Sequence, residues 1–243
     1  MPDRTIAPPI KDPVDFNITL KPCTHATLRN GVKMYYINDG TEEVSQIEFI
    51  FSAGNWYEQK NGVASATNSL IKNGTKKRNS FEITDYFEYY GAYLNFSCFN
   101  EYSTITLHCL SKFLKELLPI IRELITEATF PANELEIYQQ NRIQMLSVNL
   151  LKCDFVADRL IDEHLYGVNH PYGKKTGKED IQAISREDLL QFYQQYYLKA
   201  KCCIFSAGKL PADFEELIDK NFGDLDLNEM TPTITHERIV STQ

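Results

Sequence analysis

The sequence predicts an α+β domain in which a mixed or antiparallel sheet packs against helices. In residues 45–52 and again in 93–110, apolar residues recur at every second position with polar residues between them, which is typical of half-buried strands. Residues 111–128 instead repeat apolar side chains with the period of a helix. Strands that come first, with helices before a last strand at 202–207, indicate layers of sheet and helix around one core.

Composition limits the class of protein. The chain has 243 residues, of which 43% are hydrophobic and 24% charged, so it can bury one substantial core and reads as soluble and globular. The net charge of −8 argues against a nucleic-acid partner. Neither a secretory signal nor an apolar run of about 18 residues is visible, so we expect no membrane span and a cytoplasmic location.

The first part of the chain is predicted to be an arm followed by strands. Residues 1–23 carry five prolines and should form an extended arm. Asn30-Gly31 is a turn signal between two short strands within residues 25–37. The strand at 45–52 places three apolar side chains on one face, those of Ile47, Phe49 and Phe51.

The middle of the chain combines helices with a hairpin. A helix is expected from about Gly62 to Lys72, and a second should begin at the N-cap Asn79-Ser80 and end at Gly91. Residues 93–99 and 102–110 then form the two strands of the hairpin. The short basic run between the helices, residues 72–78, is predicted to be a solvated loop.

Helices dominate the rest of the chain. In the helix at 111–128, Pro119 should cause a kink or start a second segment. Pro131 opens the next helix, to about residue 151, and Asp154 is a candidate cap for a helix over 155–166. The remaining elements are expected in this order: a helix at 185–198, a strand at 202–207 and a helix at 211–221.

Cysteine and histidine usage shows no metal-binding pattern. The six cysteines form no Cys-x-x-Cys pair, which favours reduced, mostly buried thiols; a disulfide framework is the less favoured alternative. The five histidines have no ligand spacing. No zinc site is therefore predicted from these residue types.

Several short motifs, in order and spacing, resemble the insulinase/pitrilysin family of zinc peptidases. They are Leu28–Val32, Ala53–Glu58, Gly62–Thr75, Gly91–Asn95 and His170–Gly173. The family also contains mitochondrial processing peptidase and the core subunits of the respiratory bc1 complex. The resemblance runs from about residue 24 to 225 and implies a metallopeptidase-like domain, followed by a linker at 226–243 toward a second, similar domain. The chain is then either a one-domain protein or, as we favour, the front half of a longer one.

The zinc motif of that family is degenerate in this chain. Active members carry His-x-x-Glu-His on the helix that matches residues 62–75, where the histidines bind zinc and the Glu polarises the bound water. This sequence has Ser65, Asn68 and Ser69 at those positions. Hydroxyls are poor zinc ligands, and an amide cannot act as a general base. From this segment alone, an ordinary amphipathic helix explains the residues equally well.

The third zinc ligand of the family, a Glu on a later helix, also has no counterpart. The resemblance places it at Met145, if no gap intervenes, and neither Met145 nor its neighbours are carboxylates. The resemblance therefore implies that zinc, expected for the family, is absent here.

Three function hypotheses follow from the resemblance. The favoured one is a catalytically inactive homologue that forms the non-catalytic half of a peptide-degrading or processing complex. Its partner would be a homologous domain or subunit, either with or without an intact His-x-x-Glu-His. Asn95, Phe96 and Ser97 are its candidate contacts for extended peptides, although an ordinary sheet strand also explains them. The alternatives are a purely structural assembly subunit and an active zinc endopeptidase with other ligands.

Overall fold

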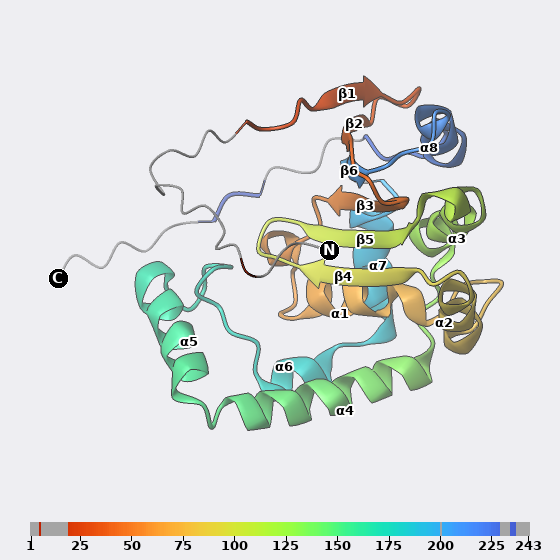
Figure 1. Ribbon diagram of the computed structural model, residues 1–243. Helices are drawn as coiled ribbons and strands as arrows, with labels where there is room; N and C mark the ends of the chain where they lie inside the picture. Colours follow the sequence, from red (N-terminus) through yellow and green to blue (C-terminus); the bar gives the residue numbers. More distant parts are fainter. Residues whose placement is uncertain (1–4, 6–18, 200, 229–233, 237–243) are drawn as a thin grey trace.

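The computed structural model confirms the predicted α+β class and describes residues 5, 19–199, 201–228 and 234–236 (Figure 1). Six strands form one mixed sheet in the order β1-β2-β6-β3-β5-β4. Only the β2–β6 pair is parallel, and all other neighbours are antiparallel. The strands are β1 Thr24–Thr27, β2 Lys33–Asn38, β3 Val44–Phe51, β4 Tyr93–Cys98, β5 Ser103–Leu110 and β6 Cys202–Gly208.

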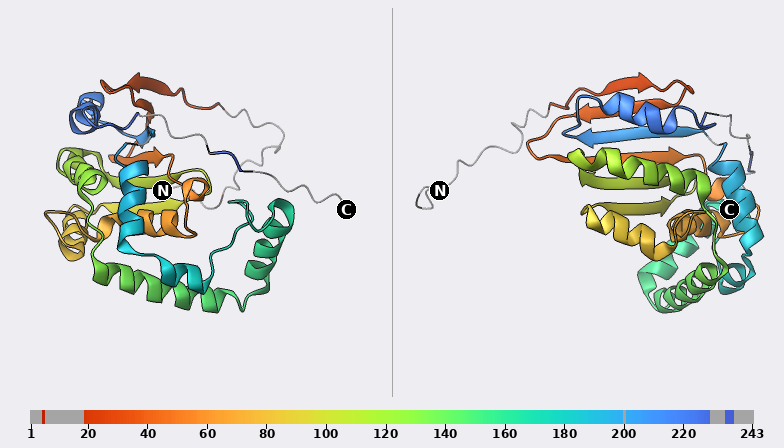
Figure 2. Two further views of the ribbon diagram at one scale, coloured as in Figure 1. Left: turned by 180° about the vertical axis from the view of Figure 1, so that it is seen from behind. Right: turned by 90° about the vertical axis from the view of Figure 1, so that its right-hand side faces the viewer.

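Eight α-helices within the described residues pack on one face of this sheet and beyond its β4 edge, and Figure 2 shows α3 and α8 lying side by side along it. The long α4 and the protruding α5 form a frame on the side of β4 (Figure 1). Short 3-10 turns occupy Asn55–Tyr57, Ile71–Asn73 and Ser111–Phe113. The helices are α1 Val63–Leu70, α2 Ser80–Tyr89, α3 Leu114–Glu127, α4 Ala132–Asn149, α5 Cys153–Tyr166, α6 Lys178–Ala183, α7 Arg186–Tyr196 and α8 Phe214–Phe222.

The core lies on one face of the sheet. Along β3, the predicted apolar face of Ile47, Phe49 and Phe51 is fully buried. Phe49 packs on Phe222 of α8 with 4.7 Å between ring centroids, and Phe51 packs on Tyr197 at 5.0 Å. Aromatic pairs at this spacing add to the free energy gained from burial. The helices are therefore held to the sheet by large apolar contacts.

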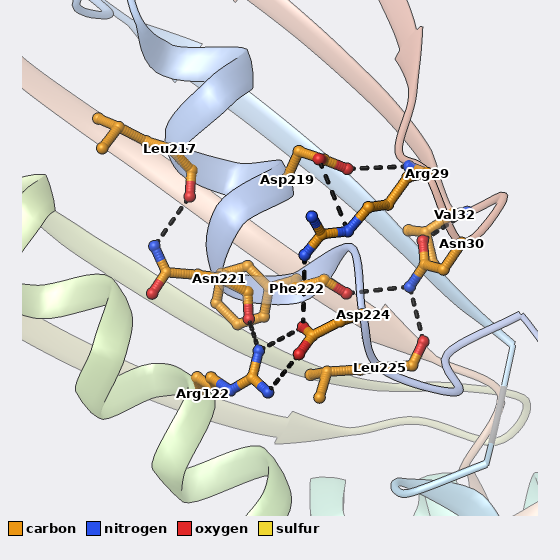
Figure 3. Close-up of polar contacts among 10 residues, drawn as sticks. All are labelled: Arg29, Asn30, Val32, Arg122, Leu217, Asp219, Asn221, Phe222, Asp224 and Leu225. Carbon is orange, nitrogen blue, oxygen red and sulfur yellow. Dashed lines mark hydrogen bonds and ion pairs between the residues drawn. The ribbon is translucent and has the colours of Figure 1, made fainter.

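Figure 3 shows how the predicted Asn30-Gly31 turn is tied to the end of α8. The Asn30 side-chain amide donates to the carbonyl oxygens of Phe222 and Leu225, at 2.9 and 2.7 Å. Arg122 of α3 makes a bidentate ion pair with Asp224 beside them. These bonds join segments from the two ends of the chain, so the turn has a tertiary role as well as a local one.

Two predicted helix features differ in the structure. Pro119 starts no second segment, because α3 is continuous from Leu114 to Glu127. The apolar face of α3, buried along most of its length, outweighs the one backbone hydrogen bond that a proline removes. Asp154 lies inside the first turn of α5, where its charge suits the helix dipole, and Lys152 is the N-cap residue.

The basic run is more than a solvated loop. Arg78 forms an ion pair with the buried carboxylate of Glu123 in α3, and the Thr75 hydroxyl donates to the same carboxylate. Lys77 pairs with Glu127 one turn later, at 2.8 Å. These contacts therefore hold the segment that follows α1 against helix α3.

The predicted arm and linker lie mostly outside the described residues. Where the chain is described, Leu227 is buried, and its carbonyl oxygen accepts a hydrogen bond from the Cys202 backbone N–H. Trp56 also donates to the Ile234 carbonyl oxygen. The domain bounds remain predictions. Within the described part of the chain, no helix has the length and hydropathy needed to cross a membrane.

Candidate functional site

The first turn of α1 is capped by a buried carboxylate from the preceding loop. Gly62 at the N-cap has φ 86°, a left-handed conformation that suits glycine. Glu58 accepts hydrogen bonds from the backbone N–H groups of Gly62 and Ala64, at 3.1 and 3.0 Å. Burial raises the pKa of Glu58, and these two bonds together with the charge of Lys174 oppose part of that rise.

The raised pKa of Glu58 predicts a pH-dependent stability. Because the folded state holds this proton more tightly than the unfolded state, the contribution of protonated Glu58 is complete below the ordinary Glu pKa and is lost as pH rises through the raised value. We expect Glu58→Gln to remove this loss, so in denaturant unfolding the stability of the variant relative to the parent protein should increase as the pH rises above the ordinary Glu pKa of about 4.3. The exposed Glu88→Gln variant is the control. A stability difference that does not change with pH would contradict the expectation.

Ser65 and Ser69 lie one helical turn apart on α1 and face the long helix α4. Both are half-buried. Helix α4 is held in place by the Asn73 amide, which donates to Glu134 at 2.6 Å, and by Gln139, which donates to carbonyl oxygens next to α6. The two serines therefore face a fixed neighbour.

The α4 residue that meets both serines is Tyr138. Burial raises the pKa of the Tyr138 phenol, and the positive charge of Arg142 and hydrogen bonds from Ser65 and Ser69 counter part of that rise. The phenol thus lies near both serine hydroxyls, on the face of α1 where active family members carry two histidines one turn apart. Sequence reasoning missed Tyr138. The available signal was its spacing: 138, 142 and 145 share one face of a helix.

Asn68, at the position of the family's general base, points into the core. It is 1% exposed and accepts a hydrogen bond from the Tyr197 hydroxyl at 3.0 Å. Its amide nitrogen donates to the Thr104 carbonyl oxygen of β5 at 3.4 Å. The Asn68 side chain is thus fully used in joining α1 to β5 and to the end of α7.

Met145 lies on the same side of α4 as Tyr138 and Arg142. Its side chain is 51% exposed, and the Arg142 guanidinium approaches its sulfur at 3.8 Å. Ser65, Tyr138, Arg142 and Met145 all line one cavity of about 290 Å³, whereas Asn68 does not. The structure therefore brings Ser65 and Met145 together, as the resemblance implies, and separates Asn68 from them.

The donor atoms around this cavity do not suit zinc. The Ser65 hydroxyl, the Tyr138 phenol and the Met145 thioether line it, with the Ser69 hydroxyl close to the phenol, in place of the nitrogen, thiolate or carboxylate ligands that zinc requires. Cys98 lies close by, but burial raises its pKa to about 11, so it stays a thiol at neutral pH. Across the described residues, no three His, Cys, Asp or Glu side chains gather into a metal site.

The predicted peptide contacts Asn95, Phe96 and Ser97 all lie on β4, the outermost strand beside the cavity. Asn95 and Ser97 share the more open face of the sheet, where the Asn95 amide donates to the Ser97 hydroxyl at 3.2 Å. Phe96 faces the opposite side and packs against the core. The three side chains cannot all contact one ligand, and what they share is the outer backbone edge of β4, which pairs with no other described strand.

Comparison with known proteins decides the family. Residues 33–166 match the model of the insulinases, peptidase family M16, and residues 183–242 match that of the M16 inactive domain. The chain belongs to the M16 family. The first match alone spans more than half of the sequence and includes Ser65, Asn68, Ser69 and Met145.

Three M16 relatives illustrate the range of similarity. The probable mitochondrial-processing peptidase subunit beta of Schizosaccharomyces pombe is 26% identical over 87% of this chain and 47% of its own length. The non-peptidase homolog YmxG of Helicobacter pylori is 27% identical over 69% of this chain and 39% of its own length. The crystal structure of a Helicobacter pylori protease superposes with a TM-score of 0.81 at 19% identity, over 90% of this chain and 55% of that one. The chain thus spans less than half the length of these two curated relatives.

Proposed function

We propose that this chain is the non-catalytic half of a two-part M16 assembly, that it carries no zinc, and that it binds extended peptide. The observation that carries the proposal is the set of side chains at the metal-ligand positions: Ser65, Ser69 and Met145 are neutral and poor zinc ligands, and the Tyr138 phenol lies near both serine hydroxyls. Asn68, tied to Tyr197 and Thr104, supports the same conclusion, because no acid or base remains on α1 to activate water.

A partner half is supported by the surface of α5. This helix has no buried residue and exposes the large apolar side chains of Leu160, Ile161 and Leu165, and Val168 just after the helix is exposed as well. Contiguous apolar surface of this kind marks interaction sites. The chain also covers only part of the length of its relatives, one of which is named as a subunit. We propose a homologous domain or subunit as the partner.

Peptide binding is proposed at the outer edge of β4. An extended peptide can add to a free strand edge through backbone hydrogen bonds, and β4 presents such an edge beside the cavity. The purely structural alternative uses the same α5 surface but makes no use of this edge, so peptide binding separates the two candidate functions.

Hydrogen exchange tests the proposal. A mixture of extended peptides should slow amide exchange in β4, residues 93–98, by about tenfold or more if the added strand forms backbone hydrogen bonds. The sheet's other outer strand, β1, is the internal control and should not change. If β4 shows no protection, either in this chain or in its complex with a partner half, peptide binding is excluded and the purely structural role remains. One zinc per chain in protein purified without a metal-affinity tag would contradict the non-catalytic assignment.

A further inference from the structure

The cavity beside Ser65 collects positive charge in a chain that is acidic overall. The cationic side chains that line it are Arg142, Arg159, Lys174 and Lys175, and Asp162 is its only lining carboxylate. Asp162 is already paired with Lys175 at 2.5 Å. The other three cations have no carboxylate within ion-pair distance among the described residues, although the whole chain has a net charge of −8.

These cations come from three separate elements and surround one space. Arg142 lies on α4 and Arg159 on α5, whereas Lys174 lies in the loop before α6 (Figure 1). Arg159 is oriented by donating to the Thr176 carbonyl oxygen at 3.3 Å and by lying 5.6 Å from the centre of the Phe155 ring. Its guanidinium is therefore partly immobilised before any ligand arrives, which lowers the entropy lost on binding.

Positive charge acts from two sides on the groups in and around the cavity. Burial raises the pKa values of Tyr138, Cys98 and Glu58; the charge of Arg142 opposes part of this rise at Tyr138 and Cys98, and that of Lys174 opposes part of it at Glu58. Neutral donors complete the lining, including the Ser65 hydroxyl and the side-chain amides of Asn55 and Asn100. Cations at two walls with neutral donors between them make a site for one small anionic group.

The position of the cavity relative to β4 indicates where that group would come from. Asn100 lies two residues after the end of β4, and the Asn55 and Trp56 backbone N–H groups donate to the carbonyl oxygens of Phe99 and Asn100. The end of the outer strand thus reaches the mouth of the cavity. A peptide strand paired with β4 would present a side chain or chain end to it.

We propose that this cavity binds a carboxylate of the extended peptide, with Arg142 and Lys174 as its charged contacts. The proposal rests on the proposed peptide binding and adds to it the chemical class of the peptide: one with an acidic side chain, or a free carboxyl terminus, at the position next to the β4 end. With a volume of about 290 Å³, the cavity has room for such a group.

Three labelled peptides of about ten residues test this by fluorescence anisotropy; at ~3.3 Å per residue they span β4 and reach the cavity. The first carries two glutamates and an amidated end, the second has glutamines instead, and the third has glutamines and a free carboxyl terminus. We expect the first, the third or both to bind about tenfold tighter than the second, as for one charge-assisted hydrogen bond. Which of the two does so identifies the source of the carboxylate.

Variants assign the contacts. Arg142→Gln and Lys174→Gln should each remove most of the tenfold preference, and Arg142→Lys should keep part of it. Lys220→Gln, an exposed lysine in the last turn of α8, is the matched control and should leave the preference intact. Thermal unfolding checks that each variant is folded, which we expect because Arg142 is exposed and Lys174 is only half-buried.

The outcomes separate the two proposals. Equal binding of all three peptides, with β4 protected from exchange, would overturn the carboxylate site and leave peptide binding in place. A carboxylate preference that survives both glutamine variants would also overturn it. Absence of binding by every peptide, to the chain alone and to its complex with a partner half, would overturn peptide binding and this inference together.

Discussion

Replacing Asn68 with Asp is expected to destabilise the fold by about 3 kcal/mol at pH 7. The change preserves the shape of the side chain, so packing is not the cause. An ionised Asp can still accept from the Tyr197 hydroxyl, but it can no longer donate to the Thr104 carbonyl oxygen, and its charge is buried without a cation. Denaturant unfolding measures the loss directly.

The loss should depend on pH in a defined direction. Burial raises the pKa of an Asp at position 68 above the unfolded value of about 3.9. Its contribution to stability is then most favourable below that value and is lost as pH rises through the folded pKa, so the Asn68→Asp variant should recover toward pH 4. The exposed Asn141→Asp variant should change stability by less than about 0.5 kcal/mol. A small, pH-independent effect at position 68 would mean that its side chain reaches water.

Rebuilding the zinc site is expected to fail unless Tyr138 is also removed. Ser65→His, Ser69→His and Met145→Glu restore three ligand types, but the Tyr138 phenol lies near both α1 positions and would crowd the metal. With Tyr138 present we expect no stoichiometric zinc, and with Tyr138→Ala added we expect about one zinc per chain. Elemental mass spectrometry on protein purified without a metal-affinity tag gives the stoichiometry.

A further variant separates the effect of the ring from that of the hydroxyl. Tyr138→Phe keeps the ring and removes the hydrogen bonds with Ser65 and Ser69, so it should still block zinc if the ring itself fills the space. Full zinc binding with Tyr138 intact would contradict our description of the site. No zinc binding after Tyr138→Ala would instead count against Met145 as the position of the third ligand.

The order of secondary-structure elements was predictable because their signals are local. The alternation over 45–52 and the Asn79 cap both appear in the structure, the latter as a reciprocal capping box with Glu82. Of the two outcomes predicted for Pro119, the second helical segment is wrong, because a local rule for prolines ignores the buried face of α3 that keeps the helix continuous. The parallel β2–β6 pair joins residues about 170 positions apart, so no local pattern could indicate it.

For the candidate site, the sequence by itself determined which chemistry is missing. Ser65, Asn68 and Ser69 are neutral side chains, and no fold can turn them into zinc ligands or a general base. Only the tertiary structure decided what replaces that chemistry: Tyr138 near both serines, Asn68 inside the core, and Arg142, Arg159 and Lys174 around one cavity. These residues meet because α1, α4, α5 and the loop before α6 pack together, and side-chain packing between distant segments leaves no periodic trace in the sequence.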